Sequence, residues 1–192
     1  MANTIEQFSE FAVKKSTVKF AGENEKAMRI GCVGTLGETL NAKTVTKKCE
    51  GVVVKSVTKG DGTGELAFTL HMKEEAFRKM FGMESKGLKA GVRTYGQGSR
   101  HTPFCYTAEV EDEGGNIKYK AYPNCCVTTG ISRKIENGAE EVAEIEVTAA
   151  VMPDTQGNGM YEAFADDLDE TTAEKWLDEF DFTLVADTGV NN

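Results

Sequence analysis

The sequence predicts a mainly β fold, a β-sandwich with one or two short flanking α-helices. Polar and apolar residues alternate with a period of two over most of residues 104–151, and again over residues 65–72, as in strands that are buried on one face. Only residues 73–83 and 172–180 carry apolar residues at helical spacing. A chain of 192 residues of which 40% are hydrophobic can bury one sizeable core, so we expect a single domain over residues 1–192.

The beginning of the chain has the weakest pattern. Residues 1–16 are expected to form a flexible N-terminal extension, because termini without a clear apolar face are often disordered in isolation. Residues 17–20 and 28–33 are predicted as short strands, separated by a polar stretch. Residues 34–42, which contain Gly and Asn, are predicted as a loop.

A glycine-rich turn over residues 59–64 predicts the tip of a hairpin between strands at residues 48–58 and 65–72. Residues 73–83 then predict a short amphipathic helix, with acids in the first turn where they favour the helix dipole. The following stretch, residues 84–103, is a long basic connection with four glycines. A loop of this length is usually functional or disordered.

Residues 104–151 predict four antiparallel strands. A two-residue turn at Gly114-Gly115 would place Val110 opposite Tyr119. The same register would pair two glutamates with two lysines across the strands, Glu109 with Lys120 and Glu111 with Lys118.

The second half of this segment predicts a longer turn. A three-residue loop over residues 137–139 places Ile131 opposite Ile145 and Val127 opposite Ala149. A two-residue loop would mix the polar and apolar faces, since a slip of one residue reverses every side chain. We therefore predict the three-residue loop.

The C-terminal part predicts a second helix over residues 172–180, with Thr171 and Glu174 as a capping box. Its buried stripe is formed by Ala173, Trp176, Leu177 and Phe180. Residues 182–185 are predicted as a final strand, and residues 186–192 as a flexible polar tail.

The net charge of −9 is concentrated near the C-terminus. Residues 160–187 hold ten acids and the single base Lys175, so that this segment alone carries −9. A general nucleic-acid-binding surface is not expected, because neutralising phosphates requires clustered Lys and Arg. Acidic surfaces are also common and aid solubility, which is the simplest interpretation of the charge.

No pattern of catalytic or metal-ligating residues emerges. The cysteines lack the paired spacing of a disulfide or zinc framework, so we expect reduced thiols at Cys32, Cys49, Cys105, Cys125 and Cys126. We predict that the chain is not an enzyme and holds no cofactor and no metal. No run approaches the ~18 apolar residues that cross a bilayer, so we expect no membrane contact and synthesis in the cytoplasm.

The order of these segments resembles the major tail protein, or tail tube protein, of long-tailed bacteriophages of siphophage type, and the related tubes of phage-like bacteriocins. The resemblance covers nearly the whole chain. It is carried by residues 49–83, by residues 104–154, and by the closing segment WLDEFDF at residues 176–182.

This resemblance implies a tail-tube fold and a structural virion protein whose rings, hexameric in that family, stack into the conduit for DNA ejection. Its partners would be further copies of the chain and other tail proteins, such as tape measure and tail-completion proteins. DNA would pass through without specific binding, which an acidic lumen would favour. No functional residue of the family transfers to a numbered position.

Charge segregation predicts where subunits touch. We expect the basic loop over residues 86–100 to pair with acids within residues 160–181 of an adjacent subunit, and the turn over residues 59–64 to make an axial contact. The candidate interface residues are therefore Lys59, Asp61, Lys86, Lys89, Arg93, Arg100, Asp166, Asp167 and Asp169. The simpler alternative is that these are solvated surface charges.

Two other functions remain open. A β-sandwich binding or adhesion module, of a phage or of a cell-surface assembly, would be a stable monomer with an exposed aromatic cluster. An enzyme would have a pocket with perturbed carboxylates or an activated thiol.

Overall fold

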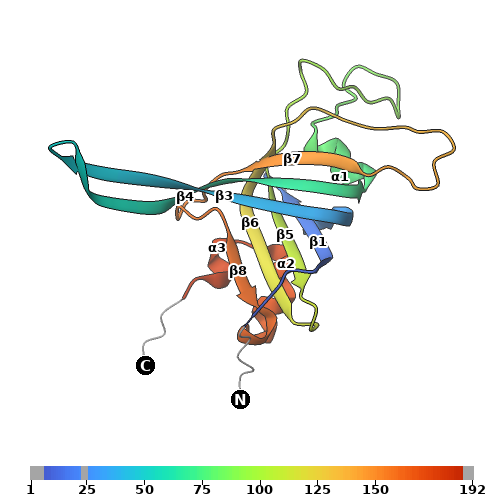
Figure 1. Ribbon diagram of the computed structural model, residues 1–192. Helices are drawn as coiled ribbons and strands as arrows, with labels where there is room; N and C mark the ends of the chain where they lie inside the picture. Colours follow the sequence, from blue (N-terminus) through green and yellow to red (C-terminus); the bar gives the residue numbers. More distant parts are fainter. Residues whose placement is uncertain (1–6, 23–25, 188–192) are drawn as a thin grey trace.

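The computed structural model describes residues 7–22 and 26–187, which form one antiparallel sheet with short helices (Figure 1). The strands in this part of the chain are β1 (Ala12–Phe20), β2 (Met28–Arg29), β3 (Gly31–Cys49), β4 (Val52–Met72), β5 (Phe104–Glu111), β6 (Ile117–Val127), β7 (Ile145–Val151) and β8 (Tyr161–Phe164). The helices are α1 (Glu74–Met80), the 3-10 helix η1 (Ala165–Asp167), α2 (Glu170–Glu179) and α3 (Phe182–Val185). The predicted mainly β class is confirmed.

The sheet folds over on itself to make two layers. Its strand order is β2-β1-β5-β6-β7-β4-β3, with β8 beside β6. Strand β6 joins the two halves, because it pairs with β7 only from Cys125 to Val127 before the strands diverge. In Figure 1, β7, β4 and β3 cross over β6, β5 and β1, and β3 approaches β1 although the two are far apart in the strand order. The two layers expected of a sandwich are thus halves of one sheet.

The main core lies between these halves. Leu66, Phe68 and Leu70 of β4 alternate inward and are almost fully buried, as their period predicts. Helix α1 closes one end of the core with Ala76, Phe77 and Met80. This confirms the helix predicted over residues 73–83.

The β3–β4 hairpin differs from the prediction. Its turn is Glu50-Gly51, where both residues have positive φ (51° and 83°) and join Cys49 to Val52, the conformation that matches the twist of a two-residue hairpin. Residues 34–42, predicted as a loop, belong to β3. The glycines of residues 59–64 lie within β4, where the register shifts relative to β3. They form a bulge, so the predicted hairpin tip at this position is wrong.

The β5–β6 register also differs, by one residue. Val110 lies opposite Lys118 rather than Tyr119. The cause is Asp112, whose carboxylate accepts hydrogen bonds from the backbone amides of Gly114 and Asn116, both at 2.8 Å. These bonds close a three-residue turn instead of the predicted two-residue turn. From Ile117 to Tyr122 the side chains of β6 are therefore on the face opposite to the predicted one, and a bulge before Cys125 then restores the predicted register.

The predicted second and third strands of the 104–151 segment are a single strand, β6. Val127 lies opposite Ala149 as predicted. The predicted Ile131–Ile145 pair is absent, because residues 128–144 form no strand. Arg133 instead lies over the ring of Phe77, 4.0 Å from its centroid, and holds this loop toward α1.

Helix α2 covers the outer face of β5 and β6. Trp176 and Phe180 pack there against Ala121 and form a second, smaller core, which confirms the helix predicted over residues 172–180. Its N-cap is Asp169, whose carboxylate accepts a hydrogen bond from the Thr172 amide at 3.0 Å, and not the predicted Thr171.

The ends of the chain complete the fold. The strand predicted over residues 182–185 is helix α3, because the Asp181 carboxylate caps it by accepting from the Leu184 amide. Residues 17–20 lie in β1 as predicted, and β1 begins at Ala12, within the N-terminal stretch over residues 1–16 that was predicted to be flexible. Of the two predicted flexible ends, residues 1–6 and 188–192 lie outside the described residues.

Candidate assembly surfaces

The outer part of the β3–β4 hairpin projects far from the body of the subunit (Figure 1). We call residues 42–60 the arm. Strand β7 pairs with β4 only from Gly64 to Leu70, so within the described part of the chain the arm is a two-stranded ribbon with both edges free. All of its residues are exposed. Such a ribbon is marginally stable in water without cover, so this geometry favours a second chain packing on it.

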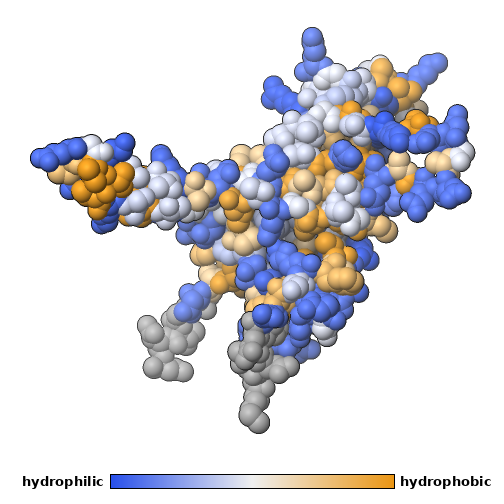
Figure 2. All heavy atoms as spheres, in the orientation of Figure 1, coloured by the Kyte–Doolittle hydropathy of each residue, from blue (hydrophilic) through white to orange (hydrophobic). Residues whose placement is uncertain are grey.

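The surface of the arm is both apolar and basic. Figure 2 shows a hydrophobic patch near its tip, where the exposed residues include Val52 (66% exposed), Val53 (51%) and Val54 (56%). The arm also carries Lys43, Lys47, Lys48, Lys55 and Lys59 against the single acid Glu50. None of these lysines forms an ion pair with any described residue.

Two pairs of these lysines face each other across the ribbon. Lys43 lies opposite Lys59, and Lys47 lies opposite Lys55. Like charges directly opposite each other destabilise a hairpin. An anionic partner would remove this repulsion.

A groove of about 490 Å³ lies beside the base of the arm, between the β6 residues Pro123 and Asn124, the loop after β7, and α3. That loop packs closely on the bulge of β4 next to the arm's base: a Cβ at Gly62 would lie 2.6 Å from the Gly157 carbonyl oxygen. The groove is lined by apolar groups with an acid on each of two walls, namely Pro123, Pro153, Phe180, Phe182, Asp154 and Asp181.

Both acids of the groove are anionic at neutral pH. Burial opposes ionisation of Asp154, but hydrogen bonds from the Tyr161 hydroxyl and from backbone amides outweigh it and hold the pKa of Asp154 below its usual value. A hydrogen bond from the Thr183 hydroxyl likewise lowers the pKa of Asp181. The groove therefore combines an apolar floor with fixed negative charge.

The candidate residues predicted from charge lie at opposite ends of the subunit. The loop that bears Lys86, Lys89, Arg93 and Arg100 lies beyond α1, whereas Asp166, Asp167 and Asp169 lie on or beside η1 and α2, at the other end (Figure 1). The structure does not bring the two groups together within one chain. They can meet only between subunits.

Two of the candidate residues have roles within the chain. Asp61 accepts hydrogen bonds from the amide (3.0 Å) and hydroxyl (2.7 Å) of Thr63 and so holds the bulge of β4, while Asp169 caps α2. Lys59 lies at the base of the arm and not on a loop tip.

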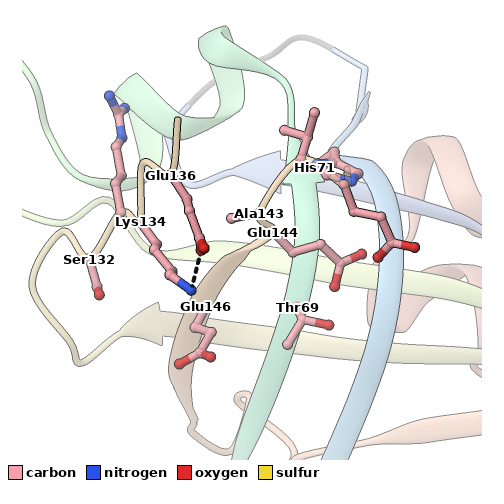
Figure 3. A pocket seen from close by; sticks show the side chains of 11 residues that line it. Thr69, His71, Ser132, Lys134, Glu136, Ala143, Glu144 and Glu146 are labelled. Carbon is pink, nitrogen blue, oxygen red and sulfur yellow. Dashed lines mark ion pairs between the residues drawn. The ribbon is translucent and has the colours of Figure 1, made fainter. Parts of the chain in front are cut away.

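A cavity of about 840 Å³ lies between β4, β7 and the loop over residues 128–144 (Figure 3). Charged groups of both signs line it, and Lys134 pairs with Glu136 at 2.7 Å. Over residues 7–22 and 26–187, no three His, Cys, Asp or Glu side chains are grouped so as to hold a metal ion. All five cysteines are free thiols, as predicted.

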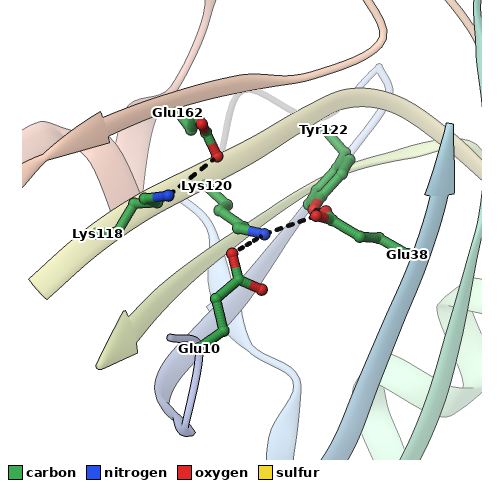
Figure 4. A network of polar contacts seen from close by, with 6 residues as sticks. All are labelled: Glu10, Glu38, Lys118, Lys120, Tyr122 and Glu162. Atoms are coloured by element: carbon green, nitrogen blue, oxygen red, sulfur yellow. Dashed lines mark hydrogen bonds and ion pairs between the residues drawn. The ribbon is translucent and has the colours of Figure 1, made fainter. Parts of the chain in front are cut away.

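A buried lysine links three parts of the chain (Figure 4). Lys120 of β6 is 1% exposed, and its Nζ lies 2.7 Å from a Glu38 carboxylate oxygen on β3 and 2.5 Å from one of Glu10. The Tyr122 hydroxyl also donates to Glu38. The predicted two-residue turn places Lys120 on the polar face of the strand, beside Glu109. The observed three-residue turn shifts the register by one residue and places Lys120 on the buried face. The sequence does contain a signal for this turn: Asp112, Glu113, two glycines and Asn116 can form an Asx-type turn, in which the Asp side chain accepts from backbone amides that follow it.

Comparisons with known proteins give distant likenesses. No protein-family model matches the chain, and no curated protein matches it. Among solved structures, the tube-terminating cap of the anti-feeding prophage is 9% identical, with a TM-score of 0.46 over 86% of this chain and 100% of that chain. The baseplate structure of the same particle contains a chain that is 11% identical, with a TM-score of 0.40 over 83% and 99% of the two chains. Scores at this level carry no functional argument.

Within the described residues, none of the helices has the length and apolar character needed to cross a membrane.

Proposed function

We propose that this chain is a structural, non-enzymatic subunit that assembles with copies of itself into stacked rings, hexameric in the related tubes, forming a phage-type tail tube. The arm is the observation that carries this proposal. A free, apolar and basic ribbon has no evident use in a monomer, whereas a repeating assembly covers it in every copy. The sequence resemblance to tail tube proteins indicates which kind of assembly this is.

The edge of the sheet supports the same proposal. Strand β3, Gly31–Cys49, ends the strand order, so its outer edge has no strand partner within the described chain. Long free edges invite pairing with other chains, and soluble monomers usually blunt them. Joining neighbouring subunits edge to edge around a closed ring would satisfy these backbone groups.

The remaining parts of the proposal follow from the proposed tube. The particle would be a virion or a phage-like bacteriocin, and other tail proteins, such as tape measure and tail-completion proteins, would contact the tube ends. DNA would pass through without specific binding, because a net charge of −9 repels phosphates. An adhesion module is less well supported, since the exposed aromatics Phe11, Tyr95 and Phe182 lie on three separate segments.

Purified protein should form rings or tubes when it is concentrated. Negative-stain microscopy and sedimentation velocity, run over a concentration series, measure this directly. Raising the salt concentration to about 1 M should weaken contacts that depend on charge, because it shortens the screening length to ~3 Å. A chain that stays monomeric at every concentration would contradict the proposal.

The basic loop makes a separate, testable contribution. We propose that Lys86, Lys89 and Arg93 of one subunit face Asp166 and Asp167 of the next. Reversing the three bases to Glu should then weaken assembly, and adding Asp166→Lys and Asp167→Lys should restore it. The matched control is Lys134→Glu, an exposed lysine outside this loop. If the triple reversal assembles like the wild type, the pairing is wrong.

A further inference from the structure

We propose that the tip of the arm of one copy docks in the groove beside α3 of a second copy, with its valines on the apolar floor and its lysines toward that copy's acids. The contact rests on the proposed self-assembly and names the surfaces that make it. Its occupant is a second copy of this chain.

The chemistry of the two surfaces is complementary. The arm offers Val52, Val53 and Val54 together with a net charge of +4. The groove offers Pro123, Pro153 and Phe182, flanked by Asp154 and Asp181. Burying exposed valines stabilises a contact in proportion to the apolar area covered.

Charge also explains why the arm needs this partner. Its two opposed lysine pairs, Lys43–Lys59 and Lys47–Lys55, repel each other in the free chain. The groove adjoins the C-terminal segment over residues 160–187, which carries −9. Docking there would place the lysines near the tip in a negative field and relieve the repulsion between Lys47 and Lys55, the pair closer to the turn.

The arm cannot fill its own groove. About nine residues separate the register shift between Leu40 and Ala42 of β3 from the Glu50-Gly51 turn. This length corresponds to ~30 Å of extended strand. The groove lies at the base of the arm, so the tip is carried away from it. A subunit of this length has a radius of gyration of ~16 Å, and the reach of the arm therefore matches the distance to a neighbouring copy.

Because arm and groove are different surfaces, the contact is heterologous and leaves one free arm and one free groove on any open chain of subunits. Contacts of this kind repeat, and they generate either closed rings or axial stacks. An arm that paired with another arm would instead give a dimer and stop.

This difference makes the test specific. One variant, Val53→Glu/Val54→Glu, removes the apolar tip and leaves the groove intact. The other, Phe182→Glu, places a charge in the groove and leaves the arm intact; Phe182 is 36% exposed at the start of α3, where an acid suits the helix end. Val142→Glu is the control, since Val142 is also an exposed apolar residue (81%) but lies in the loop over residues 128–144.

Each variant alone should associate at least tenfold more weakly than wild type in sedimentation velocity, while the control assembles normally. A 1:1 mixture of the arm variant and the groove variant should form dimers of one copy of each and nothing larger, because only one intact arm meets one intact groove. Circular dichroism melting curves show whether each variant is folded.

The outcomes separate this contact from the proposed function. The arm–groove contact would be overturned, and the tube proposal left standing, if both variants form tubes as the wild type does. The same conclusion would follow if the wild type forms tubes but a mixture of the two folded variants stays monomeric. Wild-type oligomers that depend on both surfaces but never form rings or tubes would support the contact and overturn the tube. A wild-type chain that is monomeric throughout would overturn both.

Discussion

Replacing Trp176 with Ala should lower the free energy of unfolding by about 3–5 kcal/mol, the usual cost of removing a buried aromatic. Trp176 is 2% exposed. Its ring packs against Phe180 at a centroid distance of 4.9 Å and against Tyr119 at 6.0 Å. Its Nε1 donates a hydrogen bond to the Lys120 carbonyl oxygen at 3.2 Å, and the substitution also removes this buried hydrogen bond.

The effect should be measured by denaturant unfolding followed by far-ultraviolet circular dichroism, because Trp176 is the only tryptophan and its fluorescence disappears with it. Lys175→Ala is the control: this neighbour is exposed on the same helix, and such surface changes usually stay within about 0.5 kcal/mol. A loss below about 1 kcal/mol for Trp176→Ala would mean that α2 contributes little to the fold.

The two main helices were predictable because their signals are local. Ala76, Phe77 and Met80, like Trp176 and Phe180, follow a spacing that buries one side of a helix whatever it packs against. The capping residue of α2 was missed by two positions, since Asp169 and Thr171 are both good caps and only the path of the preceding chain selects between them.

The β3–β4 hairpin was not predictable from turn residues. The glycines of residues 59–64 are the stronger turn signal, yet the chain turns at Glu50-Gly51. What decides between them is the total pairing: a turn at Glu50-Gly51 lets all of β3 pair with β4, from Gly31–Met72 to Cys49–Val52. That gain depends on residues far apart in the sequence, and turn statistics do not include it.

The candidate site was only partly visible in the sequence for the same reason. The acidic and basic segments are evident from the distribution of charged residues along the sequence. By contrast, Val52, Val53 and Val54 have the composition of a buried strand, and only the sheet topology reveals that they lie on an uncovered ribbon. The groove combines residues from four segments that are far apart in the sequence, and only the folded structure shows that these segments are neighbours.

The Lys120 cluster should show a marked asymmetry between its cation and its acids. Replacing both Glu10 and Glu38 with Gln leaves a buried ammonium without a counter-charge, which should cost about 3–5 kcal/mol. Lys120→Met should cost much less, about 1 kcal/mol, because the side chains of Glu38 and Glu10 are 30% and 44% exposed and water can solvate them. The triple variant, which combines Glu10→Gln, Glu38→Gln and Lys120→Met, should recover most of the stability lost in the double glutamate variant. A mutant cycle over these variants measures the coupling between the lysine and the two acids. A larger loss for Lys120→Met than for the double variant would contradict this account.

The pH dependence of the same coupling gives an independent check. Burial of Glu38 opposes its ionisation, but hydrogen bonds from Lys120 and Tyr122 outweigh it and lower its pKa. Its contribution to stability is therefore present above the unfolded pKa of ~4.3 and is lost as the pH falls through the lower folded value.

Burial also opposes the charge on Lys120, but the two glutamates raise its pKa. The contribution of Lys120 is therefore present below ~10.4 and is lost as the pH rises through the higher folded value. The stability difference between the wild type and the triple variant should thus be constant from about pH 5 to pH 10 and shrink on both sides. A difference that instead changed near pH 7 would assign the coupling to other groups.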